Sequence, residues 1–374
     1  MAYRRLTWPG EPYPHPVRVA KSDDPQLCAG YLAKLVEEVL PPEGRVVIAV
    51  SRKVARLWEK DFLKPLRDYR PDAVVLKLPD GEERKNLDEL QEIYRRLLRH
   101  RIDRRGLIVA IGGGVLTDMV GFAAATYMRG IAWISVPTTL TGQVDAGLGG
   151  KTGVDFSGGK NMVGAFWQPK EVFLAPVLLG TLPIKEVRSG LAEVVKTGLA
   201  LNPGILRTLR RTGTRVLEND HELLVKIVSM CAREKMTVVA EDTTDKGRRA
   251  VLNLGHTVGH AIEASGGFQR WNHGQSVAMG LMVIVSVAEQ RGKMSAEERR
   301  QTEELIGTLG LLPKTAPDPV QTGRYLTLDK KMVGNQLWAI IPGPIGQTEI
   351  CPIGAEELLD ERHWAWRQNL RRVR

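Results

Sequence analysis

The chain of 374 residues is too long for one compact core, and its length predicts about two domains. With 43% hydrophobic and 26% charged residues, its composition is that of an ordinary globular protein and excludes a largely disordered chain. The net charge of +10 is compatible with two classes of anionic partner, nucleic acids and small molecules.

The sequence contains no apolar stretch that approaches the roughly 20 residues needed to span a membrane. The longest candidate, Val277–Ala288, is predicted to be a buried core helix. The N-terminal sequence has no apolar run of the kind that a signal peptide needs, so we expect a cytoplasmic protein without a membrane partner. The three cysteines form no CxxC pair, which argues against a disulfide framework and against a cysteine zinc site.

From residue 45 to residue 176, short β-like runs alternate with helical patterns. Apolar residues recur at three- and four-residue spacing in the intervening stretches, such as 54–63 and 87–98. Alternation of this kind predicts parallel βαβ units, whose usual ligand is a nucleotide near the carboxyl ends of the strands. The predicted strands are Arg45–Ser51, Ala73–Pro79, Leu107–Gly113, Ala132–Pro137 and Val172–Pro176.

The densest run of positive charge, RRLLRHRIDRR, spans Arg95–Arg105. Tyr94, Leu97, Leu98 and Ile102 lie at helical spacing beneath it, which indicates the solvated face of a helix. Because no zinc-finger or RNP signature accompanies the run, we expect no nucleic-acid partner.

Beyond Pro183 the pattern becomes mostly helical, and strand-like residues return only near Leu337–Ile341. We therefore predict an α/β Rossmann-like domain over residues 1–182 and a mainly α-helical domain over residues 183–374.

Two turns in the first half have sequences that suit a phosphate group. Gly112–Asp118 follows a predicted strand, and its glycines allow backbone amides to approach a phosphate at a helix N-terminus. Pro137–Thr139 follows the next strand in the same way. Each motif alone is equally compatible with an ordinary strand-to-helix turn, but two such turns at successive strand ends favour an anion site.

A lysine-containing glycine loop, Gly149–Gly153, resembles the end of a Walker A motif but lacks its leading glycine, which argues against an NTPase. Lys151 in this loop, with Lys160 and Asn161 shortly after it, offers donors for a phosphate or carboxylate. Asp145 is either a general base or a turn residue.

The strongest signal is a group of histidines. His256 and His260 form an HxxxH pair that lies on one helical face, and His273 follows. The zincin proteases need glutamate after the first histidine, where this chain has Thr257. Glu193 can complete a site of two imidazoles and one carboxylate, which suits Zn²⁺ and leaves a position open for substrate. Lys196 lies one turn away, among apolar neighbours that argue against a simple surface ion pair.

Several of these motifs together resemble the 3-dehydroquinate synthases, in the family's order from Gly112 to Glu263. The matching runs are GGGVLTDMVGFAAATYMRG, VPTTLTGQVDAGLGGKTGVDF, GKNMVGAFWQP, SGLAEVVKTGL and LNLGHTVGHAIE. Weaker matches at Gly81–Lys85 and Leu328–Lys331 extend the resemblance over most of the chain.

This resemblance implies a phosphate-eliminating carbon–oxygen lyase, with its site in a cleft between the two domains. It implies bound NAD⁺, one divalent metal ion (zinc or cobalt) and a homodimer. The implied metal ligands are Glu193, His256 and His273, whereas His260 faces the substrate instead of the metal. The implied cofactor contacts are Glu82, Lys85, Gly113, Gly114, Val115, Asp118, Thr138, Thr139, Lys151, Lys160, Thr181 and Leu182.

The implied substrate is a sugar acid phosphate, 3-deoxy-D-arabino-heptulosonate 7-phosphate. The reaction implied is transient oxidation by NAD⁺, phosphate elimination, reduction and intramolecular aldol closure. The residues implied to act on the substrate or bind it are Arg129, Asp145, Lys151, Lys160, Asn161, Lys196, Lys235, Arg249, Asn253, His260, Lys330 and Lys331. Three alternatives remain: a sibling cyclase making a valiolone or an inosose, a metal-dependent polyol dehydrogenase, and a basic nucleic-acid-binding protein.

Three features depart from the family pattern. Gln275 stands where the family has glutamate in HGE, and Ala146 and Gly147 replace the serines that often follow the QVD aspartate. The strand ending at Ser51 lacks the acidic residue often found against the adenosine half of the cofactor. The last departure puts one cofactor contact in question and leaves the implied ligands intact.

Overall fold

The computed structural model describes residues 3–6, 15–326, 332–333 and 336–370. The chain forms two compact units, the first made of Met1–Pro183 and Asn219–Thr244, the second of Ile184–Glu218 and Asp245–Arg374. The first break falls between Pro183 and Ile184, next to the predicted boundary. The segment Asn219–Thr244 belongs to the first unit, although the sequence prediction assigned it to the helical domain.

The first unit is built on a seven-stranded sheet in the order β1-β2-β9-β6-β5-β3-β4. All neighbouring strands are parallel except β1 and β2. The strands are β1 (Tyr3–Arg5), β2 (Val17–Ala20), β3 (Val46–Ser51), β4 (Val74–Leu78), β5 (Leu107–Gly112), β6 (Ala132–Pro137) and β9 (Glu171–Leu174). The predicted parallel α/β architecture is therefore confirmed, while β1 and β2 were not predicted.

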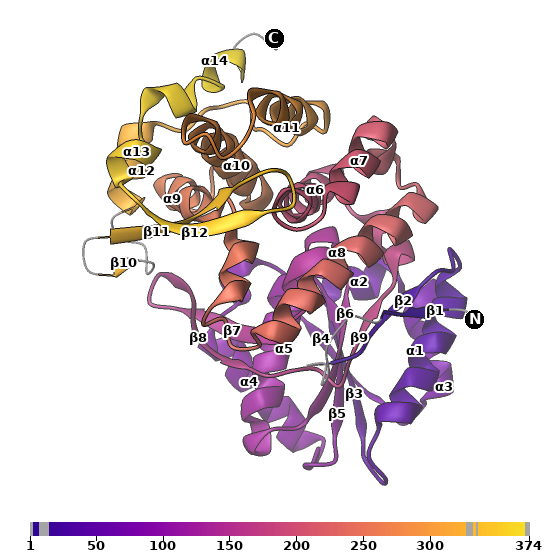
Figure 1. Cartoon of the computed structure of the whole chain (residues 1–374). Helices are drawn as coiled ribbons and strands as arrows, with labels where there is room; N and C mark the ends of the chain where they lie inside the picture. The colour runs from indigo at the N-terminus through magenta and orange to yellow at the C-terminus, as the bar shows by residue number, and fades with distance from the viewer. Residues whose placement is uncertain (1–2, 7–14, 327–331, 334–335, 371–374) are drawn as a thin grey trace. The chain divides into compact units, whose positions relative to one another are not determined.

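Helices cover both faces of this sheet, which is why its central strands β3 and β5 are buried at every position. On one face, Ile48 of β3 packs in a core with α1 (Pro25–Val39) and α3 (Lys64–Tyr69). On the other, Val47 packs with α4 (Leu87–Arg99) and α5 (Gly114–Thr126). Figure 1 shows these two helix pairs on opposite sides of the strands. Leu98, expected beneath the basic run, is instead 59% exposed on α4.

The shorter elements of the first unit differ more from prediction. The stretch 54–63, predicted as one helical pattern, is α2 (Arg52–Leu57) followed by the π-helical segment η1 (Glu59–Leu63). A hairpin of β7 (Lys151–Phe156) and β8 (Gly159–Phe166) was not predicted. The remaining elements are η2 (Glu82–Arg84), η3 (Tyr127–Arg129), η4 (Gly142–Ala146), η5 (Pro176–Thr181) and α8 (His221–Glu241).

The second unit is mainly helical, as predicted. Its central helix α10 (His273–Gln290) is buried along most of its length and contains the stretch Val277–Ala288. The other helical elements are α6 (Ile184–Ala200), α7 (Pro203–Thr212), η6 (Gly213–Glu218), η7 (Arg248–Asn253), α9 (His256–Ser265), α11 (Ala296–Thr308), α12 (Pro319–Leu326), α13 (Ala355–Leu358), η8 (Glu361–Trp364) and α14 (Arg367–Leu370).

A small antiparallel sheet accompanies these helices. It consists of β10 (Met332–Val333), β11 (Gln336–Pro342) and β12 (Thr348–Ile353). The predicted strand Leu337–Ile341 lies within β11, and β12 was missed. Among the described helices of both units, none is long and apolar enough to cross a bilayer.

Candidate metal centre and cofactor site

Three side chains from separate helices of the second unit converge on one point. Glu193 lies within α6, while His256 and His273 are the first residues of α9 and α10. One ligand atom from each lies within 4.8 Å of the others. Glu193 Oε1 is 2.7 Å from His273 Nε2 and 3.5 Å from His256 Nε2. Two imidazoles and a carboxylate in this arrangement fit a divalent ion such as Zn²⁺.

Glycines allow the three helices to approach closely enough to bring these residues together. A methyl group at Gly274 would collide with the backbone of Ser189 on α6. A methyl group at Gly280 would meet the Gly255 carbonyl, and one at Gly259 would lie 2.9 Å from the Ser276 carbonyl oxygen. The close packing of α6, α9 and α10 therefore requires glycine at the level of the histidines.

The first turn of α10 is held by a capping box. The Asn272 side chain accepts a hydrogen bond from the Gln275 amide at 2.9 Å, and the Gln275 side chain accepts one from the Asn272 amide at 3.2 Å. Glutamine and glutamate serve equally at this position of a capping box. The departure from the family's HGE at Gln275 therefore preserves the helix start that carries His273.

The electrostatics of the cluster keep the carboxylate charged. Glu193 is fully buried, which alone would raise its pKa, but Lys196 and the two imidazoles hold that pKa well below its usual value. Lys196 Nζ lies 2.7 Å from Glu193 Oε2, and its side chain is 1% exposed. The apolar surroundings predicted for this pair are thus confirmed.

The two imidazoles differ in protonation. Burial lowers the pKa of His256 despite the neighbouring Glu193, so its ring is neutral near pH 7. Burial acts in the same direction on His273, but Glu193 and Glu263 outweigh it and raise its pKa to about 10. The cluster thus holds a neutral imidazole beside an imidazole whose proton a metal ion would have to displace.

His260 lies on the same helix as His256, and the ring centroids are 5.2 Å apart. Its side chain is exposed, and it is not part of the Glu193, His256 and His273 cluster. The helical HxxxH pair predicted from spacing exists, but the second imidazole of the cluster comes from His273. Arg249, buried, and Asn253, half-buried, lie on η7, which packs against the helix of Glu193.

In the first unit, the two glycine- and threonine-containing turns lie side by side. Strands β5 and β6 are neighbours, and the Thr138 amide donates to the Gly112 carbonyl at 2.8 Å. Gly113 caps α5 without a side-chain hydrogen bond. A methyl group on Gly113 would lie 3.1 Å from Thr139 Cγ2, which explains the small residue. Both turns thus stand at the carboxyl ends of adjacent parallel strands, where α/β sheets bind nucleotides.

Several predicted cofactor and substrate residues contact one another beside this edge. Buried Lys85 donates to Asp118 at 2.6 Å and to Asn161 at 2.5 Å, and Lys160 lies 3.7 Å from Glu82. Burial opposes charge on Lys85, but Asp118 raises its pKa. The pKa of Asp118 is also raised, because burial outweighs the effect of Lys85.

Asp145 lies in η4 and pairs with Lys235 of α8, whose ammonium also donates to the Asp145 carbonyl at 2.5 Å. Asp145 is therefore more than a turn residue. Thr181 accepts a hydrogen bond from Trp58 at 3.0 Å, directly before Leu182.

Two further substrate candidates have exposed side chains. Lys151 is exposed at the start of β7, and Arg129 is exposed on η3 with a left-handed backbone of φ 67°. Lys330 and Lys331 lie outside the described residues.

The end of β3 at Ser51 lacks an acidic residue of its own, but Asp80 lies beside it in space. The Ser51 hydroxyl donates to Asp80 Oδ1 at 2.6 Å, and the Lys53 amide donates to Asp80 Oδ2 at 3.0 Å. Asp80 follows β4, the strand next to β3, so a neighbouring strand supplies the carboxylate. Sequence reasoning missed Asp80, although its place directly after a predicted strand is a usable signal.

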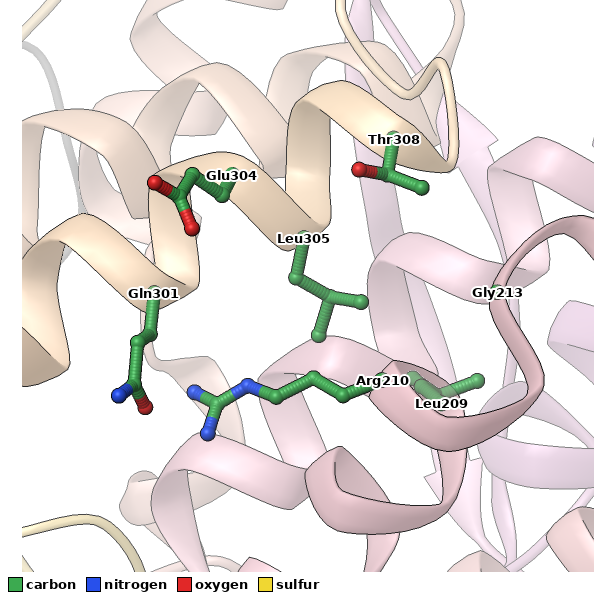
Figure 2. Close-up of a pocket in the computed structure, with 7 residues that line it drawn as sticks. All are labelled: Leu209, Arg210, Gly213, Gln301, Glu304, Leu305 and Thr308. Atoms are coloured by element: carbon green, nitrogen blue, oxygen red, sulfur yellow. The ribbon is translucent and has the colours of Figure 1, made fainter.

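A surface hollow of about 160 Å³ lies elsewhere in the second unit, between α7 and α11 (Figure 2). Its lining contains none of the residues predicted for metal, cofactor or substrate. The lining residues are Leu209, Arg210, Gly213, Gln301, Glu304, Leu305 and Thr308.

Comparison with known proteins agrees with these motifs. A family model described as 3-dehydroquinate synthase N-terminal matches residues 75–189, and one described as 3-dehydroquinate synthase C-terminal matches residues 190–332. The 3-dehydroquinate synthase of Rippkaea orientalis is 41% identical over 340 residues, which cover 89% of this chain and 93% of that protein. That of Nitrosococcus oceani is 39% identical over 320 residues, covering 85% and 88%. The chain belongs to the 3-dehydroquinate synthase family.

Solved structures with lower identity share the fold. A 2-epi-5-epi-valiolone synthase from Streptomyces hygroscopicus subsp. jinggangensis, with NAD⁺ and Zn²⁺ bound, has a TM-score of 0.84 at 23% identity, covering 99% of this chain and 100% of that one. A 2-deoxy-scyllo-inosose synthase complexed with carbaglucose-6-phosphate, NAD⁺ and Co²⁺ has a TM-score of 0.83 at 23% identity, covering 97% and 99%. A probable glycerol dehydrogenase from Sinorhizobium meliloti has a TM-score of 0.62 at 15% identity, covering 94% and 96%.

The packing around Gly274 generates a stability prediction. Gly274→Ala is expected to lower the free energy of unfolding by about 1–3 kcal/mol, because the added methyl group meets the Ser189 backbone. Gly307→Ala on α11, where no atom lies within 4 Å of the new methyl group, is the matched control. It is expected to raise stability by up to about 1 kcal/mol through helix propensity. Urea denaturation of the metal-free proteins measures both, and equal stability of the two variants would contradict the close-packing argument.

Proposed function

We propose that this protein is a 3-dehydroquinate synthase that converts 3-deoxy-D-arabino-heptulosonate 7-phosphate to 3-dehydroquinate and phosphate, as a carbon–oxygen lyase. The observation that carries the proposal is the buried cluster of Glu193, His256 and His273 in a chain 38–41% identical to curated 3-dehydroquinate synthases over most of its length. The related valiolone and inosose cyclases share the fold at only 23% identity, which favours dehydroquinate chemistry over theirs.

The cluster fits one divalent ion, Zn²⁺ or Co²⁺, held by Glu193 Oε1 and the Nε2 atoms of His256 and His273. The two cyclase structures with NAD⁺ and either Zn²⁺ or Co²⁺ support this assignment. The NAD⁺ pyrophosphate is assigned to the turn at Gly113–Val115, where backbone amides stand at the N-terminus of α5, and to the adjacent turn Thr138–Thr139.

Asp80 is assigned to the adenosine half of the cofactor. An acidic residue at a strand end of a dinucleotide fold accepts a hydrogen bond from the ribose 2′-hydroxyl. Because Asp80 stands beside the end of β3, it takes the role that Ser51 cannot fill. Lys85 donates to Asp118, and Lys160 lies beside Glu82. The remaining cofactor contacts are assigned to Glu82, Lys85, Asp118, Thr181 and Leu182.

When bound, NAD⁺ supplies a reversible oxidation at a ring carbinol and the metal ion supplies Lewis acidity at the oxygen concerned. The chain's own residues provide position and charge. Lys196 holds a positive charge against Glu193, and both side chains are buried. Lys151 and Lys160 are directed to the leaving phosphate, with Asn161 as a further donor.

Asp145 and Lys235 form a buried pair that orders the loop after β6. On η7 and α9, Asn253 and exposed His260 offer hydrogen-bonding groups to the substrate hydroxyls. Effective molarities for well-placed groups reach about 10⁵ M or more, so positioning alone accounts for a large part of such a rate.

We further propose a cytoplasmic homodimer in which Arg129 reaches the partner's site. Arg129 is exposed, and its neighbour Met128 is an exposed apolar residue, as are Phe156 and Phe166 on the β7–β8 hairpin. Such apolar exposure supports docking of a second copy. None of the three cysteines forms a disulfide, which supports a reducing compartment.

A phosphate-release assay tests the function directly. With NAD⁺ and Zn²⁺ or Co²⁺ present, 3-deoxy-D-arabino-heptulosonate 7-phosphate is expected to release phosphate without accumulation of NADH, because the cofactor is regenerated in each turnover. Sedoheptulose 7-phosphate, which lacks the carboxylate, is expected to be inert. Preference for sedoheptulose 7-phosphate would move the protein to a sibling cyclase, and stoichiometric NADH would favour a polyol dehydrogenase.

Arg249 is the proposed partner of the substrate carboxylate. It is 1% exposed on η7, and arginine can grip a carboxylate through two parallel hydrogen bonds. Arg249→Ala is expected to reduce kcat/KM by roughly ten- to a hundredfold, which corresponds to a lost charge-assisted bond of about 1.5–3 kcal/mol. The adjacent exposed Arg248→Ala removes the same charge and is expected to leave kcat/KM unchanged. Equal kinetics for the two variants would contradict this role.

A further inference from the structure

A second buried carboxylate, that of Glu263, lies beside the cluster and faces the ring nitrogen of His273 that does not point toward Glu193. Each imidazole directs Nε2 toward Glu193 Oε1, at 2.7 Å for His273 and 3.5 Å for His256. The other nitrogen of each ring, Nδ1, must therefore be satisfied elsewhere. His256 Nδ1 lies 3.2 Å from the Leu254 carbonyl oxygen. His273 Nδ1 faces Glu263 Oε2 at 3.7 Å, within ion-pair range.

Glu263 belongs to the same rigid frame as the proposed ligands. It lies on α9 seven residues after His256 and three after His260, so all three are on one helical face. Glu263 is 5% exposed. Among the acidic residues in the described part of the second unit, only Glu193 is more deeply buried. The glycine contacts at Gly259 and Gly280 hold α9 against α10, which starts at His273.

A buried carboxylate is costly unless it interacts with a proton donor or a cation. In metal sites, a ligating histidine usually donates its second N–H to a carboxylate or carbonyl, which sets the tautomer and ring orientation and raises the basicity of the ligating nitrogen. His256 has a carbonyl in that place and His273 has Glu263. Both histidines thus direct Nε2 toward Glu193, but a backbone carbonyl faces Nδ1 of His256 and a carboxylate faces Nδ1 of His273.

We propose that Glu263 is a positioning residue that holds the Nδ1–H of His273, so that its Nε2 lone pair is presented to the metal ion. This inference rests on the metal site of the proposed function and adds a residue that does not itself bind the metal. Glu263 acts on metal affinity, and it touches neither the substrate nor the cofactor.

The test measures metal binding by the metal-free protein, independently of turnover. Glu263→Gln is expected to weaken Co²⁺ and Zn²⁺ binding by about ten- to a hundredfold in titrations against a chromophoric chelator, as is typical when such a partner is lost. The visible absorption of bound Co²⁺ is expected to change in shape, because the orientation of one imidazole is no longer fixed. Saturating metal is expected to restore most of kcat.

Glu289→Gln is the matched control. Glu289 lies at the far end of α10 and pairs with Arg299, so its loss removes one carboxylate from the same unit without altering metal affinity. Glu263→Asp, which keeps the charge, is expected to recover part of the affinity and distinguishes positioning from general loss of folding.

Three results separate the possibilities. Wild-type metal affinity in Glu263→Gln overturns the inference and leaves the metal site of the proposed function intact. Reduced kcat at saturating metal with unchanged metal affinity also overturns it, because it would place Glu263 on the substrate. Failure of the unmodified protein to bind Co²⁺ or Zn²⁺ overturns the metal site itself.

Discussion

The ion cluster around Glu193 is the interaction on which the rest of the second unit depends. A fully buried carboxylate is tolerated only with close positive or proton-donating partners, and removal of one partner of a buried pair typically costs about 3–5 kcal/mol. Here Lys196 contacts one carboxylate oxygen and two imidazoles approach the other. Lys196 and the two imidazoles therefore keep the buried carboxylate charged, and these contacts require helices α6, α9 and α10 to lie close together.

The two units place polar groups at their proposed binding sites in different ways. In the first, the parallel strands β5 and β6 end beside one another, and we propose that backbone amides at the start of α5 meet an anionic cofactor with dipoles in place of fixed charges. In the second, imidazoles at the starts of α9 and α10 meet the charged pair of Glu193 and Lys196 within α6. Glycine is the shared requirement, because a strand end must admit a phosphate and crossing helices must place His256 and His273 beside Glu193.

Local patterns predicted those parts of the molecule whose residues are governed by their immediate neighbours. Continuous apolar runs revealed β3, β5 and β6, because central parallel strands are buried on both faces. Strand β2 has only four residues, one of which is Arg18, and the hairpin β7–β8 is polar and contains glycine, so neither gives such a signal. Helical periodicity identifies a helix but not the core on which it packs, so α8 was placed in the wrong unit.

In the candidate site too, local patterns predicted some features, whereas contacts between distant segments decided others. HxxxH spacing indicated that His256 and His260 share a face. The pairing of His256 with Glu193, however, is decided by contacts between segments distant in sequence. His273 was noted within the histidine group, but only the family resemblance favoured it over His260 as the second imidazole of the site. Asp80 and Glu263 were missed because each acts through a neighbour in space, Ser51 in one case and His273 in the other.

The central claim, that Glu193, His256 and His273 form the metal centre, is tested most directly by anomalous X-ray diffraction from crystals grown with Co²⁺. The account predicts one anomalous peak per chain at the cobalt edge, bonded to a Glu193 oxygen and to Nε2 of both His256 and His273 at about 2.0–2.2 Å. A peak coordinated by His260 in place of His273, or no peak at this cluster, would contradict it.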